Sequence, residues 1–244
     1  MSAVGMGTGG FTPAEEKIHY ATADTMRRKL AKVRDPRELL AAVRGAFAGF
    51  ERAYASAPAA ARAAVVCRAG CGTCCHNDVA VQAHEVLIAA EHIQKTFPPV
   101  ELEALIARAA AHREAYAAKR DRPAGPRPQT PCVLLRDGSC SIYEDRPEIC
   151  RAYHSNNVAG CIENLAVGYE QVNVKIEGLR GRMFAVMLGI DAAVEEAGFD
   201  AHAYDFGSAL HEALTNSLCA IRWQRRETAF PASCWETSEE PSDV

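Results

Sequence analysis

Four cysteines crowd into the ten-residue stretch CRAGCGTCCH, at residues 67–76, and four more lie between residues 132 and 161. Thiolate sulfur binds zinc, iron and copper(I), and it is also the nucleophile of thiol redox enzymes. Cys71 and Cys74 are separated by two residues, a spacing that lets both sulfurs reach one metal ion. The sequence therefore predicts a metal site, whose candidate ligands are Cys67, Cys71, Cys74, Cys75, Cys132, Cys140, Cys150 and Cys161.

The number of thiols bears on the kind of metal. A structural zinc ion takes four ligands in a tetrahedron, so eight thiols suit two zinc ions. Iron–sulfur clusters usually take four cysteine thiolates each, so one cluster with thiols left over fits as well. Cys75 adjoins Cys74, so its side chain points elsewhere, toward another metal atom or the core. The count leaves both alternatives open.

Other interpretations of CRAGCGTCCH fit its surroundings less well. Buried, inert cysteines are the first, but glycine and polar residues flank these thiols and no core periodicity is present. A thioredoxin-like Cys71–Cys74 pair belongs at a strand-to-helix turn in a βαβ unit. Cys67-x3-Cys71-x2-Cys74 also has the spacing of radical-SAM proteins, which place it after the first strand of a βα barrel. Neither context is present, because the approach to Cys67 is an alanine-rich helix without βα alternation.

The second cysteine segment, PCVLLRDGSCSIYEDRPEICRAYHS, covers residues 131–155. Asp137-Gly138 stands between two short β-prone runs, which is typical of a hairpin turn. We expect this hairpin to bring Cys132 and Cys140 together.

A capped helix beginning at Asp145 is expected to follow the hairpin. It would place Cys150 and His154 four residues apart on one face, which makes His154 a candidate ligand. His76 is a weaker candidate beside Cys75. His154 otherwise orients a ligand or faces solvent.

The two cysteine segments together resemble the YkgJ-like cysteine-cluster family, the CxxCxxCC group of zinc- or iron-chelating proteins. The resemblance covers about residues 67–155, and Cys161 fits a looser downstream position. One departure is that no proline follows Cys132, which should alter the loop without removing the site. The resemblance implies metal chelation and specifies no reaction. The matching residues are Cys67, Cys71, Cys74, Cys75, Cys132, Cys140, Cys150, Tyr143, Arg146, Pro147 and Arg151.

The arginines of the second segment have two interpretations. Arg146 and Arg151 can offset the negative charge of a thiolate-bound metal and donate hydrogen bonds to sulfur. They can equally form surface ion pairs with Glu144 or Glu148. Tyr143 is expected to pack against the hairpin.

The elements that must position these residues are mostly helical. Thr12-Pro13-Ala14-Glu15 carries the capping residue, proline and glutamate of a helix start. Periodicity and capping signals predict helices from residue 13 and over about 36–55, 58–66, 81–95, 100–119, 160–196 and 207–226. The predicted fold class is mainly α: a single-domain helical bundle with a small β-hairpin and cysteine-rich loops around a metal site. The loop at 67–76 and the segment 132–161 should close on each other, shielded by the other helices.

The 244 residues suit one large domain, and 48% of them are hydrophobic. We expect a disordered N-terminus at 1–10, a helical domain at 11–230 with its cysteine core at 67–161, and a polar tail at 231–244. The net charge of −4 argues against a nucleic-acid partner. The sequence shows neither a secretory signal nor an apolar run of membrane-spanning length, so we expect a cytoplasmic protein without a membrane partner.

Several histidines, acidic residues and cysteines outside the two cysteine segments are weaker candidates. His84-Glu85 begins like the zinc-binding helix motif His-Glu-x-x-His, but Ile88 occupies the last position. His84, with Glu91 and His92, is therefore expected on a solvated face. Cys219 lies in a helical apolar pattern and is expected in the core. Cys234 is left outside the site.

The leading hypothesis is a cytosolic protein that holds an iron–sulfur cluster, most simply of the four-iron type. Cys67, Cys71 and Cys74 would supply ligands from the first segment, and one or more of the other candidate cysteines would complete the set. Its role would be electron transfer or a cluster-dependent reaction, through a redox or protein partner that the motifs do not specify. The alternatives are a structural zinc-binding interaction module, with one or two closed sites, and a protein that chelates mononuclear iron for delivery.

Overall fold

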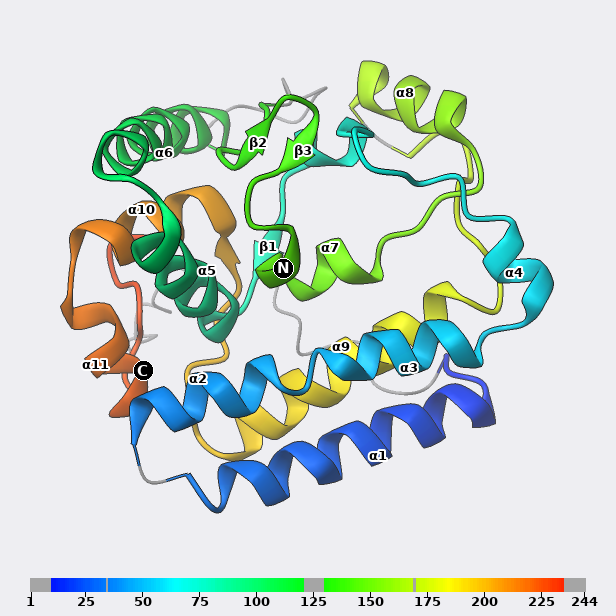
Figure 1. Cartoon of the computed structure of the whole chain (residues 1–244), viewed down its shortest axis with the longest axis horizontal. Helices are drawn as coiled ribbons and strands as arrows, with labels where there is room; N and C mark the ends of the chain where they lie inside the picture. Colours follow the sequence, from blue (N-terminus) through cyan, green and yellow to red (C-terminus); the bar gives the residue numbers. More distant parts are fainter. Residues whose placement is uncertain (1–9, 34, 121–129, 169, 235–244) are drawn as a thin grey trace, which may run out of the picture.

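The computed structural model describes residues 10–33, 35–120, 130–168 and 170–234 (Figure 1). It is mainly helical, as predicted, and its described strands form two sheets of two strands each. The helices form a lower and a left-hand group in Figure 1, and the cysteine-bearing segments lie along the upper side. No helix within the described ranges combines the length and apolar character needed to cross a membrane.

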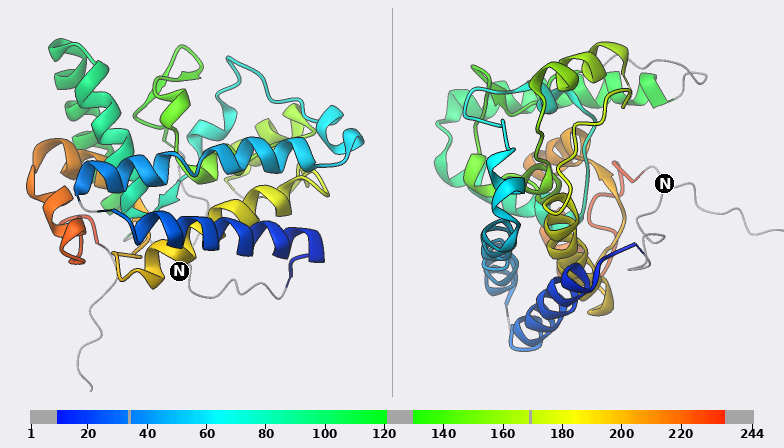
Figure 2. Two further views of the ribbon diagram at one scale, coloured as in Figure 1. Left: turned by 60° about the horizontal axis from the view of Figure 1, so that its bottom comes forward. Right: turned by 90° about the vertical axis from the view of Figure 1, so that its right-hand side faces the viewer.

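The lower group contains α1 (Pro13–Leu30), α2 (Pro36–Arg44), α3 (Ala48–Ser56) and α9 (Arg180–Glu196). α1 packs along α9, and Figure 2 shows the two helices side by side from further directions. Gly189 permits this contact, because a Cβ at this position would lie 2.7 Å from the backbone oxygen of His19. α1 begins with the predicted capping box between Thr12 and Glu15.

The left-hand group contains α5 (Ala83–Thr96), α6 (Pro99–Arg120), α10 (Phe206–Thr215) and α11 (Leu218–Gln224). α10 packs against both α5 and α6. β1 (Ala80–Val81) pairs antiparallel with β4 (Tyr204–Asp205), and this pairing joins the start of α5 to the start of α10. The two helical groups share one hydrophobic core, which extends from α1–α3 to α11.

Short elements joined by loops fill the upper, central and right-hand parts of Figure 1: α4, η2, the β2–β3 hairpin, η3, α7 and α8. The hairpin confirms the prediction, because Asp137 and Gly138 adopt φ angles of 49° and 77° at its turn. The bounds are α4 Ala59–Ala63, η2 Thr73–His76, β2 Leu135–Arg136, β3 Ser139–Cys140, η3 Tyr143–Asp145, α7 Glu148–Ala152 and α8 Val158–Val167.

The helix predicted from Asp145 is wrong at its start. Asp145 ends η3, and α7 begins only at Glu148, with Pro147 as its N-cap. The ring of Pro147 disfavours helical dihedrals at Arg146, which keeps this residue extended. α7 therefore has only five residues.

Other predicted helices are shorter than expected. The helix over 36–55 is interrupted after Arg44, next to Gly45, and resumes as α3. The helix over 160–196 is divided, because α8 ends at Gly168 in the left-handed conformation, with φ of 79°. The helix over 58–66 ends at Ala63. The predicted disordered residues 1–9, the tail residues 235–244 and most of the proline-rich connector before residue 131 lie outside the described residues, and the single-domain division stays a prediction.

Candidate metal centre

Backbone contacts close the first cysteine segment onto the second, as predicted. The amide of Cys132 donates to the carbonyl oxygen of Cys75 at 2.6 Å, and the amide of Val66 donates to Ser155 O at 3.0 Å. The Ser155 amide in turn donates to Cys67 Sγ at 3.3 Å. A hydrogen bond from a backbone amide stabilises a thiolate, so Ser155 both joins the segments and prepares one sulfur for a metal.

One group of thiols surrounds Cys67. Desolvation raises the pKa of Cys67, and the negative charges of Cys74, Cys71 and Cys161 raise it further. The thiol of Cys161 donates to Ser155 Oγ at 3.1 Å. Cys74 and Cys161 also line one small pocket together with Thr73, Asn77, Tyr153 and Asn164. Four sulfurs from η2, its preceding loop and α8 are thus neighbours.

A second group of thiols surrounds Cys150. Desolvation by the surrounding protein raises the pKa of Cys150 well above its usual range, and the charges of Cys132, Cys74 and Cys140 add to the rise. Desolvation also raises the pKa of Cys132, to about 11. A hydrogen bond to Cys75 raises the pKa of Cys74, which therefore connects the two groups.

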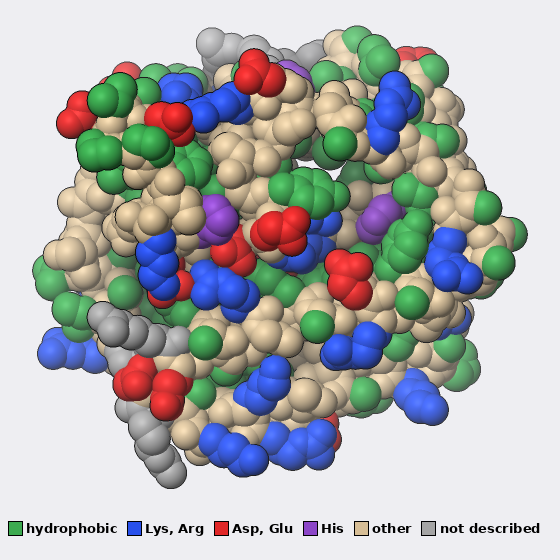
Figure 3. Space-filling view, viewed as in Figure 1, with side chains coloured by type: hydrophobic (Ala, Val, Ile, Leu, Met, Phe, Trp, Pro, Cys, Tyr) green, Lys and Arg blue, Asp and Glu red, His purple; other side chains and the backbone are tan. Residues whose placement is uncertain are grey.

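None of the eight candidate ligands forms a disulfide in the described part of the chain. Cys67, Cys74 and Cys150 keep solvent-accessible surface although the protein around them partly desolvates their sulfurs. The face seen in Figure 3 is hollowed between η2 and α7. The prediction that other helices shield the cysteines is therefore wrong for these three residues, because the lower helical group packs on the side away from η2.

The donor chemistry of these thiols fits a soft or borderline metal ion. Because the thiolates raise one another's pKa, a cation among them would stabilise their ionised forms. Within the described residues, no three sulfurs have ligand atoms all within 4.8 Å of one another. A metal ion bound by three or more of these thiolates would therefore require their sulfurs to move closer together.

Positive charge from two arginines acts on the second group of thiols. Desolvation raises the pKa of Cys140, and the charges of Arg146 and Arg151 oppose this rise. Both guanidinium groups donate to backbone carbonyls: Arg146 to Tyr143 O at 2.7 Å, and Arg151 to Arg146 O at 3.0 Å and to Glu144 O. These contacts favour the charge-offsetting role over an ion pair. Tyr143 is 59% exposed, with Arg146 stacked on its ring, so its predicted packing role is wrong.

The structure does not support the helical argument for His154. α7 ends at Ala152, so Cys150 and His154 do not share a helical face. The His154 ring lies 5.4 Å from the ring of Tyr54, and its Nδ1 is 3.4 Å from Ala152 O. His76 Nδ1 lies 3.2 Å from Gly72 O.

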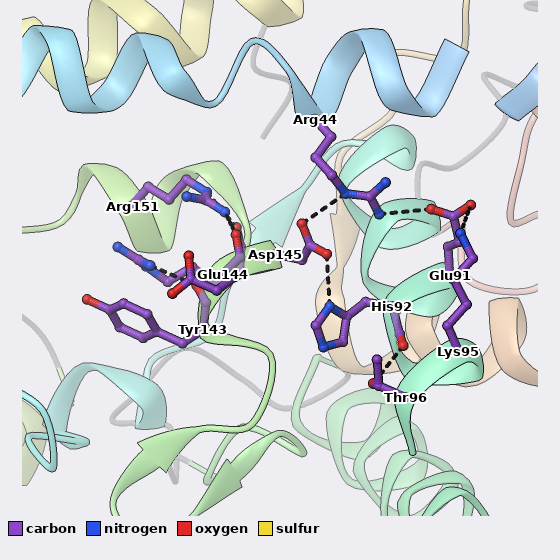
Figure 4. Close-up of polar contacts among 10 residues, drawn as sticks. Arg44, Glu91, His92, Lys95, Thr96, Tyr143, Glu144, Asp145 and Arg151 are labelled. Carbon is purple, nitrogen blue, oxygen red and sulfur yellow. Dashed lines mark hydrogen bonds and ion pairs between the residues drawn. The ribbon is translucent and has the colours of Figure 1, made fainter. Parts of the chain in front are cut away.

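The prediction of a solvated face for His84 is wrong. His84 is completely buried and contacts Glu148, whereas the nearby His92 and Glu91 are partly buried and bind Asp145 and Arg44 (Figure 4). Periodicity misses this arrangement because α9 and α7 cover the face of α5 that His84 occupies, and neither helix is near it in sequence. Cys219 is buried, as predicted, and Cys234 packs against the core.

Comparison with known proteins agrees with the cysteine pattern. Residues 66–172 match the model of the CxxCxxCC family, described as "Putative zinc- or iron-chelating domain". No curated protein and no solved structure matches the chain. The matched range contains all eight predicted cysteine ligands and stops before α9. Metal binding by this protein is thereby supported, because its residues 66–172 match the model of the CxxCxxCC family.

Proposed function

We propose that this protein holds an iron–sulfur cluster on its cysteine-bearing side and uses it in electron transfer or in a cluster-dependent reaction. The observation that carries the proposal is the separation of the thiols from the hydrophobic core. Of the eight candidate ligands, only Cys132 and Cys140 pack against that core, and both are only partly buried.

This separation weighs against a purely structural metal. Small zinc modules lack a sufficient core, so their metal supplies the folding free energy and its removal unfolds them. Here α1–α3, α5, α6 and α9–α11 already bury large side chains such as Phe50, Tyr204, Trp223 and Phe230. The fold therefore does not depend on a bound metal, and the metal can take part in a reaction or in electron transfer.

The proposed cluster ligands are Cys67, Cys71, Cys74 and Cys161. Their mutual charge effects and the pocket shared by Cys74 and Cys161 support this choice. Four thiolates match the usual demand of one iron–sulfur cluster. Cys75, Cys132, Cys140 and Cys150 then form a second donor group, adjoining the first through Cys74.

Exposure at this side suits electron transfer. Cys67 and Cys74 are exposed, so an electron donor could approach a cluster bound to them closely. Arg146 and Arg151 would offset part of the negative charge that thiolates give to a cluster. Charge and exposure are two of the factors that set a cluster's reduction potential.

The test is metal and sulfide analysis of protein purified without oxygen. We expect iron and acid-labile sulfide in near-equal amounts, about four of each per cluster, and a broad visible absorption band that bleaches on reduction. Cys71→Ser should lose the iron, the sulfide and the colour together. Cys219→Ser is the matched control, because it removes a core thiol remote from the loop, and it should keep all three.

A structural zinc module is the second candidate. It is favoured by the number of candidate thiols, because eight thiolates suffice for two closed zinc sites of four ligands each. Zinc at about two per chain without sulfide or colour would establish this candidate in place of the cluster. Labile iron without sulfide would instead indicate an iron-delivery protein.

A further inference from the structure

Three buried ionisable side chains meet where α5, α7 and α9 pack together. His84 lies in the first turn of α5, Glu148 begins α7, and Asp191 lies in α9. His84 Nε2 is 3.0 Å from Glu148 Oε1 and 4.0 Å from Asp191 Oδ1. Within the described residues, this is the one set of three His, Cys, Asp or Glu residues whose ligand atoms all lie within 4.8 Å of one another.

Several polar atoms of this set have no protein partner. The side chains of His84 and Glu148 are 0% exposed. Glu148 Oε2, Asp191 Oδ1 and His84 Nδ1 are buried and accept or donate no hydrogen bond within the described parts of the chain. Asp191 Oδ1 lies 4.0 Å from His84 Nε2, too far for a hydrogen bond. Burying a carboxylate oxygen without a hydrogen-bond partner costs free energy, so the missing partners of Glu148 and Asp191 favour a bound cation between them.

The neighbouring Glu85 shows the contrast. Its Oε2 accepts the Gln82 amide at 2.6 Å, and its Oε1 accepts the Glu148 amide at 2.6 Å. Oε2 therefore caps the start of α5, and Oε1 joins α7 to α5, so both oxygens have a partner. Glu85 therefore adds negative charge near His84, Glu148 and Asp191, but both of its oxygens already accept hydrogen bonds. The charge of Arg151 opposes the pKa rise of Glu85 and of Glu148, but its guanidinium binds backbone carbonyls.

We propose that His84, Glu148 and Asp191 bind a divalent transition-metal ion such as Mn²⁺ or Fe²⁺, at a site separate from the cysteines. One imidazole nitrogen and two carboxylate oxygens are donors that suit these ions, whereas thiolates select softer ones.

The distances agree with one shared ion. Two ligand atoms about 2.1 Å from an ion lie about 3.0 Å apart at a right angle and at most about 4.2 Å apart in line. The observed separations of 3.0 Å and 4.0 Å from His84 Nε2 fall within this range. Two carboxylates also balance the charge of a divalent cation. Asp191 is 17% exposed, which gives the ion a route of entry.

The alternative to a bound metal ion is a proton on one of the two carboxylates. Burial raises the pKa of Asp191 well above its usual range, and the charge of Glu148 adds to the rise. A proton would neutralise one carboxylate, and a divalent ion would neutralise two and use the His84 nitrogen as well. The experiment must therefore detect the metal directly.

The probe is Mn²⁺ alone, added to the full chain after EDTA treatment and desalting without oxygen. Electron paramagnetic resonance measures the free ion, and we expect one Mn²⁺ bound per chain. Glu148→Gln and Asp191→Asn should each weaken binding by roughly 100-fold or more, since even indirect supports of a metal ligand are worth about 10–100-fold. Asp145→Asn is the matched control. Asp145 also contacts a histidine, His92, but without a third ligand atom nearby, so this variant should bind as the wild type does.

Two further measurements keep the test decisive. Cys71→Ser should bind Mn²⁺ normally, which separates this site from the proposed cluster. If the carboxylate variants fail to fold, electron spin-echo spectra of Mn²⁺ on the wild type should still show coupling to one imidazole nitrogen. Absence of Mn²⁺ binding, absence of nitrogen coupling, or unchanged binding in a folded Asp191→Asn would overturn the proposal and leave a proton-sharing network.

Discussion

Glu85 holds α7 in place, and its replacement by glutamine should destabilise the protein strongly. The carboxylate is 5% exposed and accepts two backbone amides at 2.6 Å, one from Gln82 and one from Glu148. Because each oxygen accepts and neither donates, the pair of contacts requires the ionised form. Glutamine keeps one acceptor oxygen and turns an NH₂ group toward the other amide.

The magnitude follows from these two contacts. Losing one charge-assisted hydrogen bond costs about 1.5–3 kcal/mol, and the buried amide left without an acceptor costs about 1–3 kcal/mol. Removing the negative charge of Glu85 beside Glu148 offsets part of this loss of stability, because like charges where α5 and α7 meet destabilise one another. The net expectation for Glu85→Gln is a loss of about 3 kcal/mol, or roughly 6–12 °C in melting temperature for a domain of this size.

Urea unfolding followed by tryptophan fluorescence measures this loss, because one of the two tryptophans, Trp223, is 1% exposed in the folded protein. The matched control is Glu101→Gln, which removes an exposed ion pair with Arg136 at 3.0 Å. The control should change stability by less than about 1 kcal/mol. If Glu85→Gln proved as stable as the control, the argument that Glu85 joins α7 to α5 would be wrong.

Three other predictions concern the packing and the metal. Gly189→Ala should lower stability by about 1–3 kcal/mol in thermal unfolding, because its Cβ would meet His19 O at 2.7 Å; an unchanged melting temperature would contradict the close approach of α1 and α9. Gly138 has a φ of 77°, and a Cβ at this position would lie 3.0 Å from Gly70 O, so Gly138→Ala should lower the stability of the protein by about 1 kcal/mol or more. Metal analysis should also show a lower metal content per chain. Full metal loading of this variant would argue against a role for the hairpin turn in positioning the thiols. Removing metal with a chelator should leave far-ultraviolet circular dichroism and Trp223 fluorescence nearly unchanged, since the core lies apart from the cysteines; global unfolding would instead favour the structural zinc module.

Local features of this protein follow from its sequence because the interactions behind them are local. The Thr12–Glu15 capping box and the Asp137-Gly138 turn each involve residues at most three apart, and both form as predicted. The helical periodicity that buries Val43 and Phe50 also survives the interruption between α2 and α3. The cysteine spacing likewise identifies the chelating segment, which the family match over residues 66–172 confirms. The choice of the eight ligands stays a prediction.

The burial of His84 was decided by the tertiary structure alone. Its partner Glu148 is 64 residues away, and Asp191 comes from a third helix. Nothing in the local pattern of α5 distinguishes a face covered by α7 and α9 from a face open to water. The early end of α7 at Ala152 was likewise not foreseen from the local pattern, and it removes His154 from the helical face of Cys150. Short-range sequence patterns thus determined the helices, the hairpin and the metal-binding chemistry of the thiols. The packing of helices distant in sequence decided which polar side chains lie together in the buried interior, away from water.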